Sequence, residues 1–317
     1  MWSEVENTGK HTVFGVDDWL FFGPELHHIG AGRFWGKHAS TAARLAPVEY
    51  ADPLPAIIDF RDQLRALNIE LVIVPVPPKA MVYPDKLIPE FPGSLDRIPR
   101  MDGYHQEFMD ILRGEGIHVI DLLPDFLRER FEKKGSLYCR DDTHWSGRGC
   151  VLAGEMIASE IRRIGIIEPV GTDELDSEWR RIRISGDLGR TVSAESRNES
   201  LYIRVVGRRA GQILSPIQPD RTSPVLLLGD SHNLIFQAGD DMHARGAGLA
   251  DQLAFEFGIP VDLIAVRGSG ATPARINLMR RARSSSDYLS GKKVVIWCFG
   301  AREFTESDGW QNVPLTS

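Results

Sequence analysis

The chain has 317 residues, of which 42% are hydrophobic and 26% charged, and these values are ordinary for a globular protein with a sizeable core. The net charge of −7 disfavours nucleic acid as a partner, because phosphate binding requires a basic face. Three cysteines are too few for a disulfide scaffold, although Cys139 and Cys150 could pair in an oxidising compartment.

Neither a membrane span nor a secretion signal is apparent. No run approaches the roughly 20 apolar residues that cross a bilayer. The opening residues, MWSEVENTGK, lack the basic and apolar regions of a signal peptide. The sequence therefore predicts a cytoplasmic protein if Met1 is the native start, and export requires a leader removed before this numbering begins.

The first half of the chain alternates helical and strand patterns. Helical spacing of apolar residues over 53–68 is followed by the β-branched run IELVIVPVP, which predicts a buried strand. A second such pair follows, with a helix over 104–116 and the strand IHVIDL after it. Ser146 is a suitable N-cap for a helix that runs toward Ile164.

The residue pattern changes between about residues 166 and 223, where the chain is polar and lacks a clear helical period. Within this segment, SLYIRVVG alternates like an exposed strand. We expect an irregular, β-leaning insertion there. The alternation then resumes, with three apolar strands at the starts of PVLLLGDS, PVDLIAVRG and KKVVIWCFG and helices between them. The sequence predicts one α/β domain over 1–317, a three-layer sandwich around a mostly parallel sheet.

Chemistry is first indicated by LLLGDS. A buried strand delivers Ser231 to the carboxyl edge of the sheet, where ligands bind in open α/β folds. Gly229 allows a tight turn without a side chain that would block a substrate. The plain alternative is a turn at the end of a strand, since Gly, Asp and Ser are common turn residues.

A second stretch, CRDDTHWSGRGC, supplies an acid and a base. A serine nucleophile needs a base, and a histidine in that role needs a carboxylate to orient its ring. In an extended segment Asp142 and His144 fall on the same side, whereas Asp141 points away. The alternative is a helix-entry turn in which both side chains are solvated.

A third strand end, AVRGSGATP, could supply oxyanion donors. Backbone N–H groups of Ser231, Gly268 or Gly270 can face a developing negative charge. A dinucleotide-binding loop is the alternative, but the GxGxxG pattern is absent. Zinc is disfavoured because the CxxC and HExxH spacings are missing around Cys139, His144 and Cys150. We expect no metal and no cofactor.

These motifs resemble those of the SGNH (GDSL-type) hydrolases. The permuted order, with Asp142 and His144 before Ser231, resembles the alginate O-acetyltransferase AlgX/AlgJ-like group. GVDDWLFFGPEL, VPVPPKAMVYPDKL, SGDLGRTV and VVIWCFGAREF resemble further motifs of that group, with Asp18 and Cys298 as departures. The resemblance spans Gly15 to about Phe304, and it implies Ser231 as nucleophile, His144 as base and Asp142 as orienting acid. His232 departs from the residue usual after the serine, and the asparagine donor of the superfamily is unassigned.

A substrate groove is also predicted. Trp19 and Trp297 lie within apolar runs and are expected in the core. Trp35 and Trp145, together with Lys79 and Tyr83, are expected to line the groove. The plain alternative for Lys79 is a loop lysine, and for Tyr83 a packed tyrosine. A uronic-acid polymer would need positive charge near the strand ends, for which the candidates are Arg267, Arg275 and Arg302.

Three functions follow. The leading hypothesis is an O-acetyltransferase that moves an acetyl group to a hydroxyl of an alginate-like bacterial exopolysaccharide through an acetyl-serine. A carbohydrate acetylesterase shares every step except the second nucleophile. A non-catalytic polysaccharide-binding or scaffold subunit is the third. The resemblance further implies a periplasmic location and an acetyl donor relayed by a membrane-bound O-acyltransferase.

Overall fold

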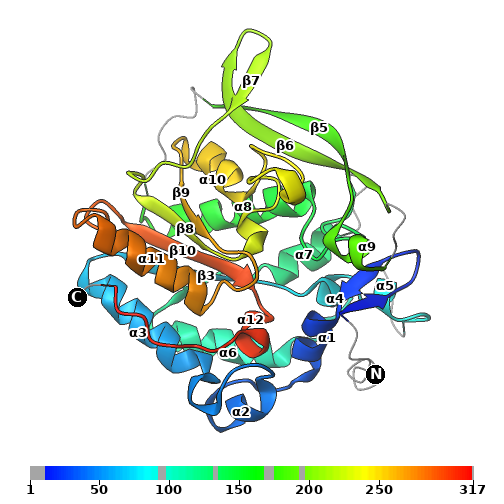
Figure 1. Cartoon of the computed structure of the whole chain (residues 1–317), viewed down its shortest axis with the longest axis horizontal. Helices are drawn as coiled ribbons and strands as arrows, with labels where there is room; N and C mark the ends of the chain where they lie inside the picture. The colour runs from blue at the N-terminus through cyan, green and yellow to red at the C-terminus, as the bar shows by residue number, and fades with distance from the viewer. Residues whose placement is uncertain (1–10, 92–97, 131–134, 168–174, 193–196, 316–317) are drawn as a thin grey trace.

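The computed structural model describes residues 11–91, 98–130, 135–167, 175–192 and 197–315, so the opening decapeptide and parts of the predicted insertion lie outside the described residues. A five-stranded parallel sheet forms the centre, in the order β4-β3-β10-β8-β9 (Figure 1). Its strands are β3 (Glu70–Val76), β4 (His118–Val119), β8 (Val225–Gly229), β9 (Asp262–Ala265) and β10 (Val294–Gly300).

Every strand of this sheet was predicted from a short apolar run, although β4 pairs over only two residues. The central strands β3, β8 and β10 are almost wholly buried, because helices cover both faces of a parallel sheet. The sequence-based prediction of a mostly parallel α/β sandwich is thus confirmed.

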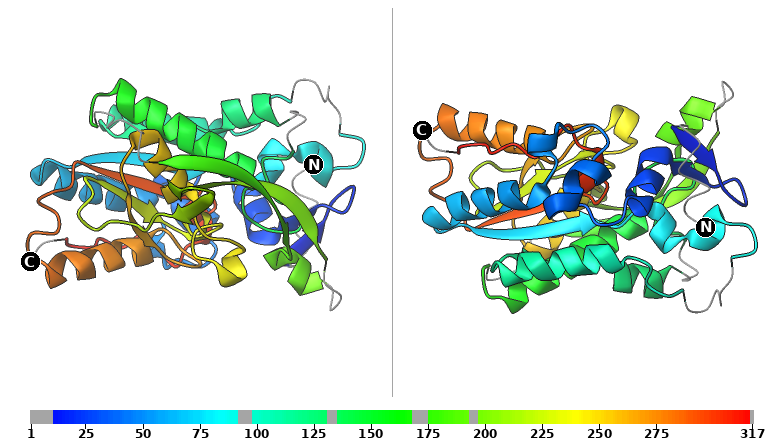
Figure 2. Two further views of the ribbon diagram at one scale, coloured as in Figure 1. Left: turned by 90° about the horizontal axis from the view of Figure 1, so that it is seen from above. Right: turned by 90° about the horizontal axis from the view of Figure 1, so that it is seen from below.

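Helices form a layer on each side of the sheet (Figure 2). One apolar core includes residues of α7 (Leu123–Glu129), α8 (Gly147–Arg163) and α10 (Leu249–Phe257). The other core includes residues of α3 (Pro53–Ala66), α6 (Gly103–Gly114) and α11 (Thr272–Ser284). Helix α8 begins where expected, since the Ser146 hydroxyl accepts a hydrogen bond from the Gly149 amide at 3.2 Å.

Two small antiparallel sheets stand beside the sandwich. One pairs β1 (Thr12–Phe14) with β2 (Leu20–Phe22). The other has the order β5-β6-β7 and lies at the top of Figure 1, formed by β5 (Asp176–Ile184), β6 (Glu199–Ala210) and β7 (Ile213–Pro216). Helix α9 (Asp187–Val192) follows β5 directly.

Short helices complete the chain. The α-helical ones are α1 (Gly23–Gly30), α2 (Ala39–Ala42), α4 (Lys79–Val82), α5 (Pro84–Leu87) and α12 (Glu303–Glu306). The 3₁₀ turns are η3 (Gly36–His38), η4 (Val48–Tyr50), η5 (Ser231–Asn233) and η6 (Asp240–Met242). Among the described residues, no helix combines the length and the apolar character that a membrane crossing requires.

Candidate active site

Ser231 stands at the carboxyl end of β8, where η5 begins. The strand ends at Gly229, and a Cβ there would lie 1.7 Å from the carbonyl oxygen of Cys298, so only glycine permits this approach to β10. The Asp230 carboxylate then caps the turn by accepting a bond from the His232 amide at 2.9 Å. Its other oxygen accepts from the Gly300 amide at 2.8 Å. These bonds tie the serine turn to the end of β10.

Asp142 and His144, the predicted acid and base, lie on a loop whose two ends are joined by backbone contacts. Tyr138 and Trp145 form an isolated antiparallel bridge, and the Cys139 amide donates to the carbonyl of His144 at 3.2 Å. Inside the loop, the Lys79 ammonium donates to the carbonyls of Leu20, Arg140 and Asp142 at 2.6, 2.9 and 3.0 Å. A buried cation thus supplies a donor to carbonyls of this irregular backbone, although that of Arg140 also accepts from the Leu20 amide at 2.9 Å.

The three side chains form one chain of hydrogen bonds. His144 Nε2 lies 2.7 Å from Ser231 Oγ, and its Nδ1 lies 2.6 Å from Asp142 Oδ1. All three residues are buried, with 1–7% of their surface exposed. The geometry allows the imidazole to take a proton from the hydroxyl while the carboxylate stabilises the imidazolium.

Asp142 is held from both sides. Besides Nδ1 of His144, it accepts bonds from the His144 amide and the Asp187 amide, both at 3.0 Å. His243 Nε2 lies 3.0 Å from Asp142 Oδ2 and donates to it. Burial alone would raise the pKa of Asp142, but the two histidines that donate to it hold this pKa well below its usual range.

The same contact shifts the pKa of His144. Burial disfavours the imidazolium of His144, yet the adjacent Asp142 carboxylate outweighs it and raises the pKa of His144 above 6.5. Asp141, by contrast, faces away toward Arg197 at 3.2 Å. The ring of His232 contacts that of His144, and burial lowers the pKa of His232.

Asp187 and His243 were not selected from the sequence. Asp187 lies in the SGDLGRTV motif, and a Cβ on the preceding Gly186 would lie 2.0 Å from the Asp141 carbonyl oxygen. That close approach brings the Asp187 carboxylate to the Thr143 amide at 2.8 Å. His243 is isolated in the sequence, which carries no local signal for its role, and in the structure it has a left-handed φ of 72°.

Asp142, His144 and Asp187 also have ligand-type atoms within 4.8 Å of one another. Both ring nitrogens of His144 already have hydrogen-bond partners, Asp142 and Ser231, and the Asp187 carboxylate accepts from the Thr143 amide. The donors are thus arranged as a hydrogen-bonded base rather than as free ligands. All three cysteines are buried and free.

Of the two glycines predicted as oxyanion donors, Gly270 lies beside the turn that carries Ser231. A Cβ on Gly270 would lie 2.8 Å from the Asp230 amide nitrogen, so this glycine packs directly against the turn. Gly268 has a φ of 94° and no heavy atom within 4 Å of the position of a Cβ. The assignment of these amides as oxyanion donors stays a prediction.

Several predicted groove residues are buried instead. Lys79 and Trp145 have no exposed surface, and Tyr83 has 4%, with its hydroxyl bound by the Leu137 amide. Trp35, at 7%, packs against Phe108. The prediction that these side chains line a surface groove is therefore wrong, because the loop and core need them for packing. Trp19 and Trp297 lie in the core as expected.

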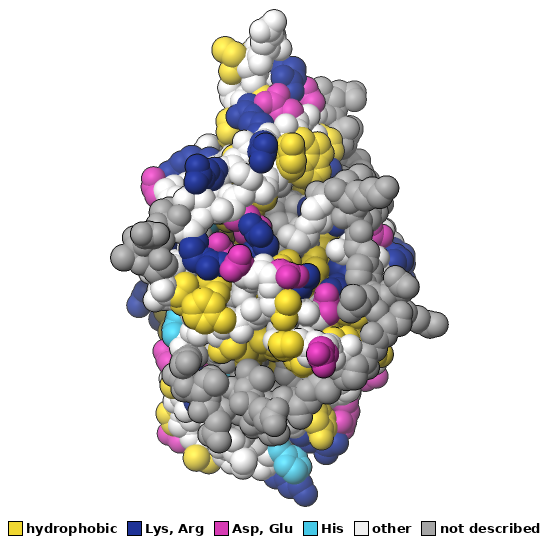
Figure 3. Space-filling model, turned by 90° about the vertical axis from the view of Figure 1, so that its right-hand side faces the viewer, with side chains coloured by type: hydrophobic (Ala, Val, Ile, Leu, Met, Phe, Trp, Pro, Cys, Tyr) yellow, Lys and Arg dark blue, Asp and Glu magenta, His cyan; other side chains and the backbone are white. Residues whose placement is uncertain are grey.

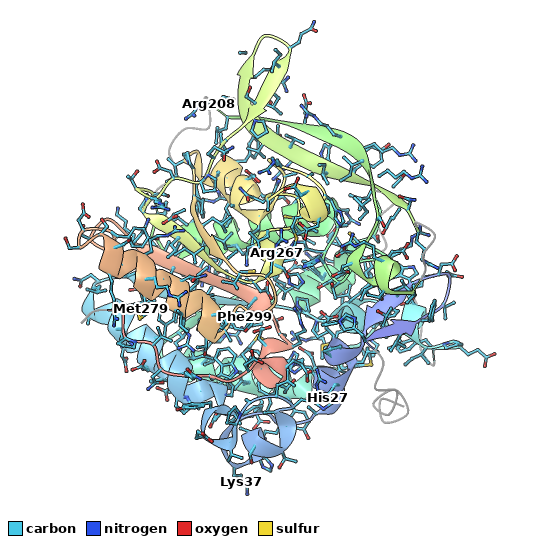
Figure 4. All side chains as sticks on the ribbon, in the orientation of Figure 1. His27, Lys37, Arg208, Arg267, Met279 and Phe299 are labelled. Carbon is cyan, nitrogen blue, oxygen red and sulfur yellow. The ribbon has the colours of Figure 1, made fainter. Side chains whose placement is uncertain are left out.

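The arginine candidates differ from expectation as well. Arg275 is fully buried beside Trp297, and Arg302 is 8% exposed with Glu25 nearby at 3.8 Å. Arg267 lies beyond β9 near the middle of Figure 4, and both of its terminal nitrogens bind Asp241 at 2.7 Å. None of the three offers an uncompensated charge at the surface, so they do not form the positive groove predicted for them.

A parallel α/β sheet with a Ser–His–Asp hydrogen-bonded chain at its carboxyl edge is the arrangement of the SGNH hydrolase-like class. The family model described as "SGNH hydrolase-like domain, acetyltransferase AlgX" matches residues 12–301, and the chain belongs to this family. It is similar in fold to the O-acetyltransferase domain of Pseudomonas putida AlgJ, with a TM-score of 0.64 and 21% identity over 93% of this chain and 92% of that one.

Two named relatives share low sequence identity with this chain, and each matches over only part of its own length. The probable alginate O-acetylase AlgJ of Pseudomonas aeruginosa is 25% identical over 53% of this chain and 39% of its own length. The alginate biosynthesis protein AlgX of Azotobacter vinelandii is 22% identical over 76% of this chain and 47% of its own. The chain thus spans less than half the length of these two relatives.

Proposed function

We propose that this protein is an O-acetyltransferase that acetylates a hydroxyl of an alginate-like bacterial exopolysaccharide through an acetyl-serine. The observation that carries the proposal is the continuous hydrogen-bonded chain from Ser231 through His144 to Asp142, at 2.7 and 2.6 Å, in a member of an acetyltransferase family. A serine hydroxyl paired in this way is activated as a nucleophile.

The reaction has two half-steps. In the first, Ser231 Oγ attacks the acetyl carbonyl while His144 Nε2 takes its proton, and collapse of the adduct expels the donor's leaving group, which receives that proton. In the second, a sugar hydroxyl loses its proton to His144 and attacks the acetyl-serine. The ester passes to the sugar, and the proton returns to Ser231.

The negative oxygen of each tetrahedral adduct needs preorganised donors. The backbone N–H groups of Ser231, Gly268 and Gly270 are our candidates. The contact of Gly270 with the backbone of Asp230 supports its inclusion. The amide of His232 is excluded, because it already donates to Asp230.

The acetyl donor and the compartment rest on family likeness. We propose that a membrane-bound O-acyltransferase supplies the acetyl group and that the reaction takes place in the periplasm. The chemistry requires no metal and no cofactor, since the nucleophile, base and orienting acid all come from this chain.

The test uses 4-nitrophenyl acetate as donor, with and without an oligouronate acceptor. Release of nitrophenol is followed by absorbance, and acetylated sugar is detected by mass spectrometry. Ser231→Ala and His144→Ala should each lower turnover by about 10³-fold or more, because the members of such a triad act as a unit. Ser290→Ala and His118→Ala, far from the site, are the matched controls.

Each result separates the candidate functions. Acetylated sugar supports the transferase, whereas acetate released at the same rate with and without acceptor supports an esterase. No turnover by the wild-type protein would leave a non-catalytic scaffold. Activity retained by His144→Ala would show that the base has been misassigned.

A further inference from the structure

The outward face of β5 and β6 carries four side chains that the proposed reaction does not use: Trp179, Arg181, Arg183 and Tyr202. We call this set the β5 face. The three residues of β5 alternate along the strand and therefore lie on one side of it, roughly 6.7 Å apart. Tyr202 pairs directly with Arg181 in the antiparallel register, so the two share that side.

Both the aromatic rings and the charges of the β5 face are accessible. Trp179 is 50% exposed and Tyr202 is 52% exposed, and both arginines are exposed. Among the described residues, neither Arg181 nor Arg183 has an acidic partner. In the upper part of Figure 3, where the antiparallel sheet lies, several Lys and Arg side chains are visible with Asp and Glu side chains among them.

Neighbouring arginines of the same sheet are compensated. Arg180 binds Glu178 at 2.5 Å, and Arg204 binds Gln252 at 2.7 Å and Glu155 at 3.2 Å. Arg181 and Arg183 thus differ from these neighbours in lacking an acidic partner among the described residues, on a protein whose net charge is −7. Such a local excess attracts an anionic ligand.

The strand leads from this face to the catalytic loop. β5 ends at Ile184, and three residues later the Asp187 amide donates to Asp142. The distance along the strand from Trp179 to Arg183 is roughly 13 Å, which is room for more than one sugar unit. A polymer lying along β5 would thus be directed toward Ser231.

We propose that the β5 face is the surface that binds the carboxylated polysaccharide acceptor. This inference rests on the proposed function and adds the surface that holds the chain. A guanidinium matches a carboxylate in a two-bond geometry, and an exposed indole or phenol ring can stack on the face of a sugar. A carboxylated sugar chain satisfies both demands at once.

Protection of a sheet edge is the plain explanation for arginines on β5, since charges there discourage pairing with another strand. It accounts for Arg181 and Arg183 but not for two half-exposed aromatic rings beside them. Single-stranded nucleic acid would also use rings and positive charge, but the overall acidity of the chain opposes it.

Binding of fluorescent oligogalacturonate to the full chain tests the proposal, with a neutral galactan oligosaccharide and oligo(dT) as parallel probes. Arg181→Gln combined with Arg183→Gln should raise the Kd for oligogalacturonate about tenfold, and Trp179→Ala about fivefold. Arg280→Gln combined with Arg283→Gln, on exposed positions of α11, makes the same change in net charge and should alter the Kd less than twofold. Because all these positions are exposed, the variants should retain the wild-type melting temperature.

The proposal is overturned if the wild-type protein binds oligogalacturonate no more tightly than galactan, if oligo(dT) binds as tightly, or if both double variants weaken binding equally. Binding does not require turnover, so Ser231→Ala should keep the wild-type Kd. A wild-type protein that binds oligogalacturonate through the β5 face but transfers no acetyl group would refute the proposed function and leave this surface standing.

Discussion

Replacement of Asp142 by Asn tests the catalytic assignment most directly. The carboxylate accepts four hydrogen bonds, two on each oxygen, from His144, Asp187 and His243. An amide has only one oxygen, so its NH2 group must face two donors in either orientation. The imidazole of His144 then loses the partner that fixes its tautomer. We expect kcat to fall about 10⁴-fold, or about 5 kcal/mol of transition-state stabilisation.

The assay is nitrophenyl acetate turnover, run beside near-UV circular dichroism to confirm folding. Two charge-assisted hydrogen bonds are lost at a buried site, so the free energy of unfolding should also fall by about 3–5 kcal/mol. Asp141→Asn is the matched control, because Asp141 is equally buried but faces Arg197 rather than His144. If the folded Asp142→Asn protein kept more than about 1% of wild-type kcat, or if Asp141→Asn lost as much, our choice of the orienting acid would be refuted.

Four further predictions concern the surroundings of the triad. Lys79→Met should lower the free energy of unfolding by about 3 kcal/mol or more, measured by denaturant titration, because the carbonyls of Leu20 and Asp142 lose a buried charged donor; a change below 1 kcal/mol would contradict this role. His243→Leu should lower kcat about tenfold, and His243→Gln, which keeps a donor for Asp142, should lower it less; equal effects would dismiss the hydrogen bond. The base must be neutral, and the pKa of His144 is raised, so acylation should decline as the pH falls through a value above 6.5; a decline centred below 6 would count against it. Burial raises the pKa of Glu303 to about 7, so the folded state keeps a proton that the unfolded state loses above pH 4.5, and stability falls as the pH rises from 4.5 to about 7 and then levels off. Glu303→Gln should remove about 3 kcal/mol of that dependence between pH 4.5 and 8, and an unchanged slope would locate it elsewhere.

The strand ends could be read from the sequence because their signals are local. Apolar runs such as Val225–Leu228 predict buried strands, and a Gly–Asp–Ser turn at the end of one places a hydroxyl at the sheet edge. The pairing of Asp142 with His144 was also accessible, since two residues in an extended segment share a side. The permuted order of the motifs supplied the likeness to the family.

Burial of polar side chains could not be read in the same way. Lys79 looked like a groove residue, but its ammonium is enclosed by carbonyls from two segments that are distant in the chain, Leu20 on one and Arg140 and Asp142 on the other. Arg275 likewise lies on an amphipathic helix, and only packing against Trp297 shows that it faces the core. Charge compensation of Arg267 by Asp241 depends on the fold of both loops.

The sequence by itself determined the order of strands and helices along the chain, the α/β class, the Ser231 turn after β8 and the pairing of Asp142 with His144, because each depends on neighbours along the chain. Only the tertiary structure decided that Asp187 and His243 meet Asp142, which arginines are neutralised, and that Tyr202 joins the alternating residues of β5 on an open face. Those facts depend on contacts between residues far apart in sequence, and no local pattern encodes the distance that separates them in space.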